Sequence, residues 1–326
     1  MSDPASNRVS FIIPVYNEKE SLRFLHAGIR EAMGKLGRPC EIIFVDDGSR
    51  DGSDRVLDEL FASDPDVQVI HLRRNFGKAA ALAAGFAQAR GEILFTLDAD
   101  LQDDPVEIPK FLARIEEGYD LVSGWKSPRR DPLTRRLASW VYNRVAGRLA
   151  GVKLHDMNCG FKAYRREATE YLNLYGEMHR YIPVIASSFG FRIGEVKITH
   201  HRRRFGKSKY GLWRFFSGFF DLFTVLILTR WAARPQHVFG MFGLLLTLAG
   251  AGITLALLVW RLMGNFLSNR PLFYLGLSVL IVGIQVVFFG FLAEMIAHSR
   301  SADTFYSIRE HRRHAPPASP PEEGAR

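Results

Sequence analysis

The sequence predicts an α/β fold with a mostly parallel, Rossmann-like sheet covered by helices on both faces, followed by a membrane hairpin of two helices. Two observations carry this prediction. Apolar strands alternate with amphipathic helices from residue 9 to residue 124, the pattern of a parallel sheet buried on both faces. Two uncharged apolar stretches, 238–260 and 271–293, then follow, each about the 20 residues that a bilayer-spanning helix needs.

The elements of the sheet domain can be assigned in chain order from their periodicity and their end signals. Pro14 is expected to end sheet pairing in the first strand, because proline cannot donate to a ladder. The predicted strands cover 9–15, 41–45, 67–71, the run that begins at Ile93, 120–124 and 193–200. The predicted helices cover 20–36, 53–62, an alanine-rich stretch ending at 89, 106–117, 137–149 and 183–189.

The rest of the chain is predicted to place the protein in the inner (plasma) membrane. Basic residues are more frequent outside the hairpin than in its short link, so both termini and the sheet domain are expected on the cytoplasmic side. Residues 210–235 are rich in Trp and Phe, which suits helices lying in the membrane interface. The predicted organisation is a disordered 1–8, a cytoplasmic sheet domain over 9–209, interfacial helices over 210–235, the hairpin over 236–297 and a disordered tail over 298–326.

Composition narrows the class of partner. The 326 residues carry a net charge of +9, which favours acidic partners such as nucleotide phosphates, anionic lipids or nucleic acid. The two cysteines, Cys40 and Cys159, are far apart and lack CxxC spacing, which argues against a disulfide framework or a zinc site. The polar N-terminus has no apolar run, so no cleavable signal peptide is expected.

The central strand ends in two carboxylates, Asp98 and Asp100, with Gln102 two residues further on. Ligands of open α/β sheets bind outside the carboxyl ends of the strands. Residues i and i+2 of a strand share a side, so both carboxylates can converge on one point and hold Mg²⁺ or Mn²⁺ together with a diphosphate. The alternative interpretation is a solvated acidic turn.

The first two strands also end in polar groups that could take a nucleotide. Tyr16, Asn17 and Glu18 follow the first strand, and Asp46 and Asp47 follow the second. Carboxylates and an amide can accept hydrogen bonds from a base or from ribose hydroxyls. Neither GxGxxG nor a P-loop motif is present, so phosphates would be held through a metal. A turn with a helix N-cap is the alternative for the Asp46-Asp47-Gly48-Ser49 stretch.

A basic run, 202–209, lies just before the aromatic stretch. It could attract anionic lipid headgroups in general. The more specific interpretation, which we favour, is that it grips one phosphate at the membrane surface.

These motifs, in this order, resemble the polyprenyl-phosphate glycosyltransferases of glycosyltransferase family 2, over residues 9 to about 293. The resemblance rests on Pro14-Val15-Tyr16-Asn17-Glu18, Asp46-Asp47-Gly48-Ser49, Asp98-Ala99-Asp100-Leu101-Gln102, Cys159-Gly160-Phe161-Lys162 and Arg203-Arg204-Phe205-Gly206-Lys207-Ser208-Lys209. It implies a GT-A fold, a nucleotide-sugar donor, a polyprenyl-phosphate acceptor such as undecaprenyl or dolichyl phosphate, and inversion at the anomeric carbon. Family precedent also suggests a homotetramer.

The resemblance also implies roles for individual residues. The catalytic candidates are Asp98, Asp100 and Asp156, and Asp156 could orient the acceptor or be a structural hydrogen-bond acceptor. The metal candidates are Asp98, Asp100 and Gln102. The nucleotide-sugar candidates are Pro14, Tyr16, Glu18, Asp46, Asp47, Asp98 and Asp100. The acceptor-phosphate candidates are Lys126, Arg135, Arg136, Arg203, Lys207, Ser208 and Lys209.

The leading hypothesis is therefore an enzyme that transfers a hexose to polyprenyl phosphate for cell-envelope glycans, with UDP-glucose as first donor and GDP-mannose as second. No nucleic-acid partner is expected. A processive polysaccharide synthase is one alternative, but it would usually carry QxxRW, and Leu228-Thr229-Arg230-Trp231 lacks the Gln. A catalytically inactive membrane adaptor is the other, and it would not need the Asp98, Asp100 and Gln102 set.

Overall fold

A computed structural model describes residues 8–127, 154–174, 176, 178–201, 235–264 and 271–299. Several predictions concern residues outside this part of the chain. They are the helix over 137–149, the interfacial helices, both termini, and the site candidates Arg135, Arg136, Arg203, Lys207, Ser208 and Lys209.

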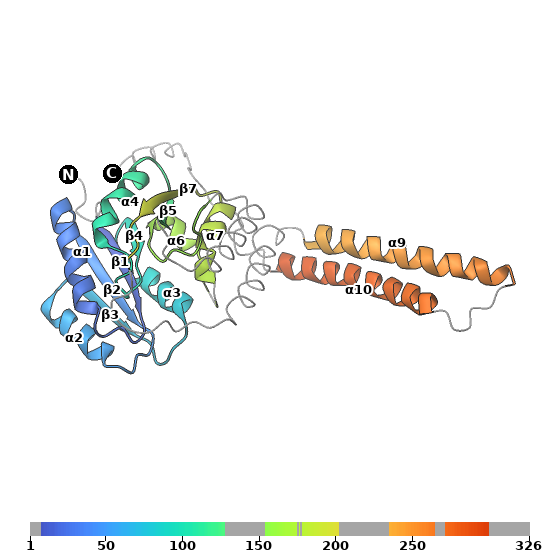
Figure 1. The fold of residues 1–326 in the computed structure, drawn as a ribbon, viewed down its shortest axis with the longest axis horizontal. Helices are drawn as coiled ribbons and strands as arrows, with labels where there is room; N and C mark the ends of the chain where they lie inside the picture. Colours follow the sequence, from blue (N-terminus) through green and yellow to red (C-terminus); the bar gives the residue numbers. More distant parts are fainter. Residues whose placement is uncertain are drawn as a thin grey trace, which may run out of the picture.

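A seven-stranded sheet in the order β3-β2-β1-β4-β6-β5-β7 forms the centre of the first domain (Figure 1). Its strands are β1 Val9–Val15, β2 Cys40–Asp46, β3 Val67–His71, β4 Ile93–Thr96, β5 Leu121–Lys126, β6 Lys162–Arg165 and β7 Ile193–Ile198. All neighbouring pairs are parallel except those of β6, which runs antiparallel to β4 and to β5. The predicted mostly parallel α/β sheet is confirmed.

Helices cover both faces of this sheet, as predicted. The helices are α1 Leu22–Leu36, α2 Ser53–Ser63, α3 Lys78–Gln88, α4 Ile108–Glu116, α6 Arg166–Glu170 and α7 Ile182–Ser188, with short 3₁₀ turns η1 Pro105–Glu107 and η2 Met178–Arg180. Successive side chains of a strand point to opposite faces. Phe11 of β1 accordingly packs in one core with α1, α2 and α4, whereas Ile12 packs in the other with α3 and α7.

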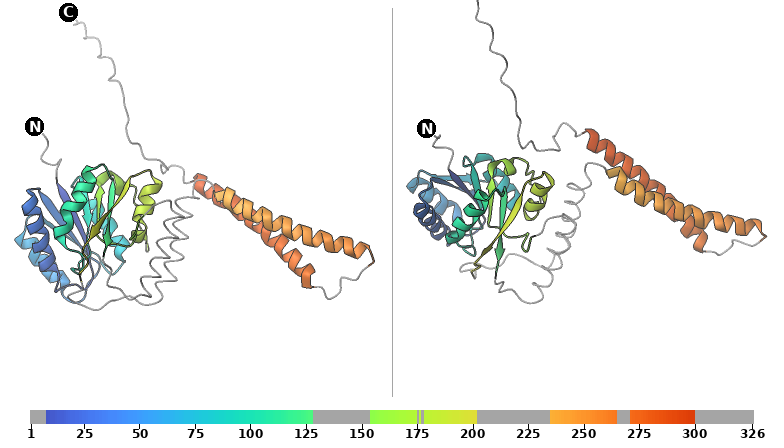
Figure 2. Two further views of the ribbon diagram at one scale, coloured as in Figure 1. Left: turned by 45° about the horizontal axis from the view of Figure 1, so that its top comes forward. Right: turned by 90° about the horizontal axis from the view of Figure 1, so that it is seen from above.

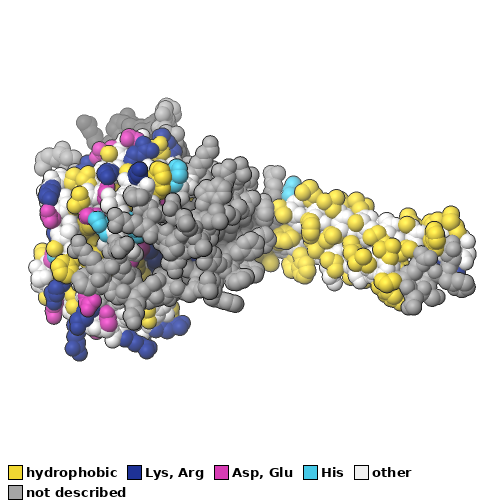
Figure 3. Space-filling view, viewed as in Figure 1, with side chains coloured by type: hydrophobic (Ala, Val, Ile, Leu, Met, Phe, Trp, Pro, Cys, Tyr) yellow, Lys and Arg dark blue, Asp and Glu magenta, His cyan; other side chains and the backbone are white. Residues whose placement is uncertain are grey.

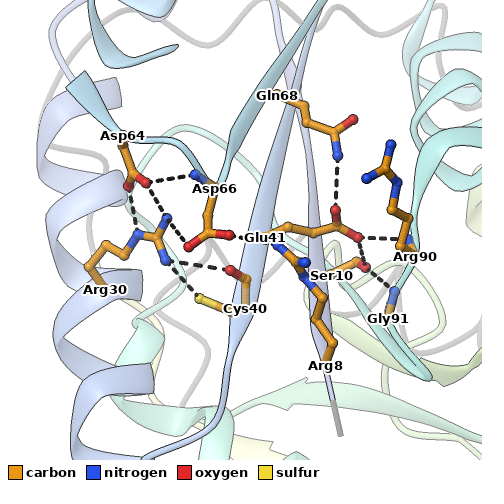
Figure 4. Close-up of polar contacts among 10 residues, drawn as sticks. All are labelled: Arg8, Ser10, Arg30, Cys40, Glu41, Asp64, Asp66, Gln68, Arg90 and Gly91. Carbon is orange, nitrogen blue, oxygen red and sulfur yellow. Dashed lines mark hydrogen bonds and ion pairs between the residues drawn. The ribbon is translucent and has the colours of Figure 1, made fainter. Parts of the chain in front are cut away.

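The amino ends of the strands are joined by buried polar contacts rather than by a ligand site (Figure 4). The buried carboxylate of Glu41 in β2 accepts hydrogen bonds from Ser10 Oγ of β1 at 2.6 Å and from Gln68 Nε2 of β3 at 2.9 Å. It also accepts one from the backbone N–H of Arg90 at 2.6 Å. Glu41 therefore ties three strands and the entry to β4 together at the edge opposite the predicted site.

Two predictions about strands need correction. β6 was not predicted, although its first residue belongs to the Cys159-Gly160-Phe161-Lys162 motif. Pro14 does not end all sheet pairing, because it still pairs with Val45 of β2. Pairing with β4 ends earlier, at Ile12 and Thr96, so the missing N–H of Pro14 lies beyond the end of β4 and leaves that ladder intact.

Two long helices, α9 Pro235–Leu262 and α10 Pro271–Ser299, form a hairpin that projects from the sheet domain (Figures 1 and 2). Their mean hydropathies are 2.3 and 2.4, and both are long and apolar enough to cross a membrane. On the face seen in Figure 3, hydrophobic side chains are spread along the length of both helices. The predicted stretches 238–260 and 271–293 lie inside these two helices.

Glycines let the two hairpin helices approach closely. A Cβ on Gly243 of α9 would lie 2.7 Å from the backbone nitrogen of Val287, and one on Gly283 of α10 would lie 2.8 Å from Cα of Thr247. The glycines at this contact recur every seven residues, at Gly243 and Gly250 in α9 and at Gly276, Gly283 and Gly290 in α10. Such small residues are typical of close helix packing in membranes. Gly252 of α9, by contrast, has no atom within 4 Å of its Cβ position.

Candidate active site

The order of strands along the sheet reverses between β1 and β4, which is where α/β sheets bind ligands. Polar loops gather at the carboxyl ends of these strands and of β2. Leu97 donates its N–H to the carbonyl of Ile12 at 3.3 Å, and Asp47 donates to that of Val15 at 2.8 Å. The two acidic turns therefore begin on either side of the end of β1.

The loop after β1 is held by the loop after β2. The backbone N–H of Asn17 donates to Ser49 Oγ at 2.9 Å, and Asn17 Oδ1 accepts from the N–H of Arg50 at 2.7 Å. Asn17 has a φ of 54°, a left-handed conformation that asparagine tolerates better than most residues. The N–H of Glu18 donates to Ser53 Oγ at 3.0 Å, so the two loops form one hydrogen-bonded unit.

Beside this unit lies a cleft of about 460 Å³. It brings together two of the predicted nucleotide residues, Tyr16 and Asp46. The carboxylate of Asp46 is fixed by the N–H of Ser49 at 3.0 Å and by His71 Nδ1 at 3.1 Å. The remaining lining residues are Gly48, Ser49, Arg50, Asp54, Asp58, His71, Leu72, Arg73, Arg74 and Asn75.

His71 and the arginines of this cleft were not predicted as site residues. Burial disfavours the charged form of His71, but the carboxylates of Asp46 and Asp58 outweigh burial and raise its pKa. Arg50, Arg73 and Arg74 add positive charge to a wall that the sequence analysis described only through its acceptors.

Asp47, a third predicted nucleotide residue, holds the protein's own loop. It is 4% exposed, and its carboxylate accepts hydrogen bonds from the N–H groups of Phe76 at 2.6 Å and Gly77 at 2.9 Å. Burial raises its pKa, and the two backbone donors offset only part of that effect. Asp47 thereby positions the 73–77 loop, part of which lines the cleft. Pro14 and Glu18 are not among the lining residues.

Asp98 lies at the end of β4 between a lysine and a glycine. Its carboxylate forms an ion pair with Lys78 at the start of α3. Burial would raise the pKa of Asp98, but the ammonium groups of Lys78 and Lys126 more than offset this and lower it. A Cβ on Gly160 would lie 2.6 Å from Cγ of Asp98, so only glycine leaves room for the carboxylate here.

Asp100 and Gln102 occupy a tight turn directly after Asp98. The N–H of Gln102 donates to Asp100 Oδ1 at 3.1 Å, and Leu101 between them has a left-handed φ of 59°. Gln102 also accepts the N–H of His201 at 2.9 Å through its carbonyl oxygen. His201 is the last described residue before the basic run 202–209.

The donor set of this turn fits a hard divalent cation that a ligand completes. Among the described residues, no group of three or more His, Cys, Asp or Glu side chains is arranged to hold a metal alone. Magnesium is usually bound through one or two carboxylates and the phosphates of a substrate. Asp98, Asp100 and the amide of Gln102 are side chains of the type that such a site uses, and their role as metal ligands stays a prediction.

Lys126, predicted to bind the acceptor phosphate, is paired inside the protein. Its Nζ lies 3.2 Å from Oδ1 of the buried Asp103. Burial opposes the charge on Lys126, but Asp103, Cys159, Asp98 and Asp156 together raise its pKa. Lys126 thus connects Asp98 electrostatically with Asp156.

Asp156 itself is 2% exposed and has structural contacts. Its N–H donates to Glu195 Oε1 at 3.0 Å, and its Oδ1 accepts the N–H of Asn158 at 3.2 Å. Both interpretations of Asp156, structural acceptor and orienting carboxylate, fit this placement.

Lys78, Lys162 and His179 were not predicted as site residues, although all three interact electrostatically with Asp98. Lys162 is 2% exposed, donates to the carbonyl of Cys159, and burial lowers its pKa to about 8. Burial, with the positive charge of Lys78, lowers the pKa of His179 to about 2. The available signals were the Gly-Lys pair before the alanine-rich helix and the Gly-Phe-Lys motif.

Residues 10–172 match the sequence model of the family described as "Glycosyl transferase family 2". The chain belongs to this family. It is 38% identical to the dodecaprenyl-phosphate galacturonate synthase of Rhizobium johnstonii, over 93% of this chain and 91% of that protein. It is also 38% identical to the undecaprenyl-phosphate 4-deoxy-4-formamido-L-arabinose transferase of Pectobacterium atrosepticum, over 91% and 90% of the two chains.

The fold of this family 2 chain also matches solved structures. The glucosyl-3-phosphoglycerate synthase of Mycobacterium tuberculosis in complex with Mg²⁺ and UDP superposes with a TM-score of 0.53 over 69% of this chain and 80% of that one, at 19% identity. The likeness confirms the GT-A-like fold. The resemblance inferred from the motifs is likewise confirmed by the family match and by the relatives.

Proposed function

We propose that this chain is a membrane-bound inverting glycosyltransferase that moves a sugar from a nucleoside diphosphate to polyprenyl phosphate at the cytoplasmic face. One observation carries the proposal. The Asp98-to-Gln102 turn, which suits a donor diphosphate, is hydrogen-bonded to His201, and the predicted acceptor motif begins two residues later. Relatives that align over about nine-tenths of the chain, both spans included, are named for transfer to polyprenyl phosphates.

The nucleoside is proposed to occupy the cleft beside β1 and β2. Its volume of about 460 Å³ falls within the range of small-molecule sites. The carboxylate of Asp46 is held by two contacts and can accept further hydrogen bonds from a base or ribose hydroxyl. Tyr16 offers a ring and a hydroxyl, and the arginines of the cleft offer charge to phosphate oxygens.

The diphosphate is proposed to lie at the Asp98-to-Gln102 turn, where Asp98, Asp100 and Gln102 would hold Mg²⁺ or Mn²⁺. When bound, the ion would neutralise charge on the leaving diphosphate. Lys78 already pairs with Asp98, so it is placed to move toward the incoming phosphates and keep the site close to neutral.

The reaction itself needs little proton transfer. A phosphate monoester with a second pKa of about 6 is largely dianionic at neutral pH, so its oxygen is already a nucleophile. That oxygen forms a bond to the anomeric carbon from one side while the bond to the diphosphate breaks on the other, which inverts the configuration. The barrier then lies in bringing two anions together, and oriented positive charge lowers it. Because the acceptor oxygen needs no general base, the role that we propose for Asp156 is to orient the acceptor.

The sugar is open to direct test. UDP-glucose is the first donor to try and GDP-mannose the second, and the names of the relatives add galacturonate and 4-deoxy-4-formamido-L-arabinose donors. Membranes holding the native chain, Asp98→Asn or the surface control Glu31→Gln would be incubated with each labelled donor and polyprenyl phosphate, with and without EDTA.

Metal-dependent label in butanol-extractable lipid, lost in Asp98→Asn and kept in Glu31→Gln, is the expected result. A labelled polymer in place of the lipid would support a processive synthase. If the protein still binds nucleotide but transfers no sugar from any donor, the result would favour the inactive membrane adaptor.

The proposed topology has its own test. The link between the spans is expected outside the cytoplasm, so a cysteine in place of Asn265 should react with a membrane-impermeant maleimide added to intact cells. A cysteine in place of Glu31 in the sheet domain should react only after lysis. Labelling of both in intact cells, or of neither, would contradict this orientation.

A further inference from the structure

His71 lies at the end of β3, directly beside Asp46 at the end of β2. The two residues are paired in the register of these parallel strands, and the N–H of Leu72 donates to the carbonyl oxygen of Asp46 at 2.9 Å. Asp58 contacts the same histidine from α2. The sheet and a helix therefore fix the place of His71, which lines the same cleft as Tyr16.

Both ring nitrogens of His71 contact a carboxylate. Nδ1 lies 3.1 Å from Oδ2 of Asp46, and Nε2 lies 3.2 Å from Oδ1 of Asp58. A carboxylate oxygen only accepts hydrogen bonds, and a neutral imidazole has a single N–H. Both contacts are therefore hydrogen bonds at the same time only in the imidazolium form. Burial alone would lower the pKa of His71, but the two carboxylates raise it above its usual value.

The two carboxylates differ in their surroundings. The side chain of Asp58 is 69% exposed and stays hydrated, whereas that of Asp46 is 5% exposed. Asp46 is oriented by His71 on one oxygen and by the N–H of Ser49 on the other, at 3.0 Å. A neutral His71 divides its one N–H between Asp46 and Asp58, so it holds Asp46 for only part of the time. Asp46 is also the acceptor proposed for the base or ribose of the donor.

The charge of His71 changes the electrostatic balance of the cleft. The charged and titratable side chains that line the cleft with it are Tyr16, Asp46, Arg50, Asp54, Asp58, Arg73 and Arg74. Among these described residues, four cationic groups accompany three carboxylates when His71 is an imidazolium, and the two numbers are equal when it is neutral. A nucleoside diphosphate is an anion, so the protonated cleft attracts it more strongly.

We propose that His71 is a positioning residue for the nucleotide, which as an imidazolium holds Asp46 toward the cleft, so that the donor binds more tightly when this proton is in place. The proposal rests on the proposed function, because it takes the cleft to be the donor site. A proton that favours the complex raises the pKa of His71 further on binding. Tight binding is therefore complete below the pKa of His71 in the free protein and is lost as the pH rises through its pKa in the complex.

Calorimetry of UDP binding to the full chain with Mg²⁺, from about pH 6 to about pH 9, tests this role. The affinity of the native chain should fall by about 10-fold over this range, the effect of losing one hydrogen bond to a charged group. The terminal phosphate of UDP titrates at about pH 6 with every variant, so the measured quantity is the ratio of native to variant affinity at each pH.

Two amide substitutions separate the two contacts of the ring. His71→Asn places an N–H near the position of Nδ1, so it should keep the contact with Asp46 and bind UDP with little dependence on pH. His71→Gln places its amide near the position of Nε2, so it should keep only the contact with Asp58. This variant should bind UDP about 10-fold more weakly than the native chain at about pH 6 and almost equally at about pH 9.

The matched control is His26→Asn. His26 also pairs with a carboxylate, that of Asp64 at 2.7 Å, but it lies on α1 and is not among the residues that line the cleft. This variant should follow the native pH profile. A readout without nucleotide is the difference in melting temperature between the native chain and His71→Gln. It should be largest below the unfolded pKa of histidine, about 6.5, and shrink as the pH rises through the raised folded value.

Three results would overturn the inference and leave the donor site in place. They are a ratio of native to His71→Gln affinity that is the same at both ends of the pH range, equal UDP affinities of His71→Asn and His71→Gln, and a difference in melting temperature that does not change with pH. If neither the native chain nor any variant binds UDP at any pH, the cleft is not the donor site. The proposed function and the inference would then both be wrong.

Discussion

Gly160→Ala offers a direct test of how tightly the donor turn is packed. A Cβ at this position would lie 2.6 Å from Cγ and 2.8 Å from Oδ1 of Asp98, whereas ordinary contact begins near 3.4 Å. Oδ2 of Asp98 would lie closer still, so the carboxylate would have to move by at least about 0.8 Å to restore ordinary contact. Because Asp98 also pairs with Lys78, the substitution displaces two charged groups together.

A displacement of this size has a predictable cost. Misplacing a catalytic group by about 1 Å can lower the rate by about 10²-fold, equivalent to about 2.7 kcal/mol of transition-state stabilisation. We therefore expect kcat/KM for sugar transfer to fall by about two orders of magnitude and the Mg²⁺ concentration for half-maximal activity to rise. Asp98 is about one-third exposed and can rotate away, so the melting temperature should fall by only a few degrees.

The matched control is Gly34→Ala in α1, where the added Cβ would have no atom within 4 Å. This variant should keep full activity. Both proteins would be compared by label transferred to extractable lipid, by metal titration and by UDP binding. If Gly160→Ala keeps kcat/KM within about threefold of the native value, the packing of Gly160 against Asp98 does not position the donor turn.

Three further predictions follow from contacts elsewhere. Burial would raise the pKa of Asp64, but its contacts with Arg30 and His26 lower it. The ionised carboxylate therefore stabilises the fold at pH values above its unfolded pKa of about 3.9. This stabilisation is lost as the pH falls through the lower pKa of the folded state. Asp64→Asn should therefore lower the melting temperature by about 4–8 °C at pH 7, from about 2 kcal/mol, and by less below pH 4; an equal loss at both pH values would contradict this. Asp47→Ala removes the carboxylate that accepts hydrogen bonds from two backbone N–H groups of the 73–77 loop. This change should weaken UDP binding, measured by calorimetry, by about 10-fold or more. Unchanged affinity would show that the loop holds its shape without Asp47. Gly283→Leu should destabilise the hairpin in detergent, because backbone of α9 lies in the way, while Gly252→Leu should not; equal melting curves would refute the close packing.

Periodicity and end signals were enough to predict most of the sheet domain. Six of the seven strands were expected, because each is a short apolar run that a turn signal ends. β6 was missed for a physical reason. Its four residues, Lys162–Arg165, begin and end with charged side chains, and Lys162 is buried only because tertiary contacts surround it. Local pattern does not report that environment.

Some residues of the candidate site could also be predicted from the sequence, and others could not. The position of Asp98 and Asp100 could be predicted because an acidic turn after a buried strand has a fixed place in a parallel sheet. The placement of Asp47 could not be predicted, because its partners are backbone groups some 30 residues away. The ion pair of Lys126 with Asp103 likewise depends on how the end of β5 meets the turn after β4. The acceptor residues Arg203, Lys207, Ser208 and Lys209 remain predictions.

The seven-residue recurrence of glycine in the hairpin fixes its register in discrete steps. Sliding α10 past α9 by one residue would bring Cβ-bearing side chains such as Ile284 to positions that admit only glycine. Residues can therefore be inserted within the glycine contact without loss of fit only as whole seven-residue units, about 10 Å each, in both helices at once. Fusions or redesigns that adapt this chain to thicker or thinner bilayers should respect that unit.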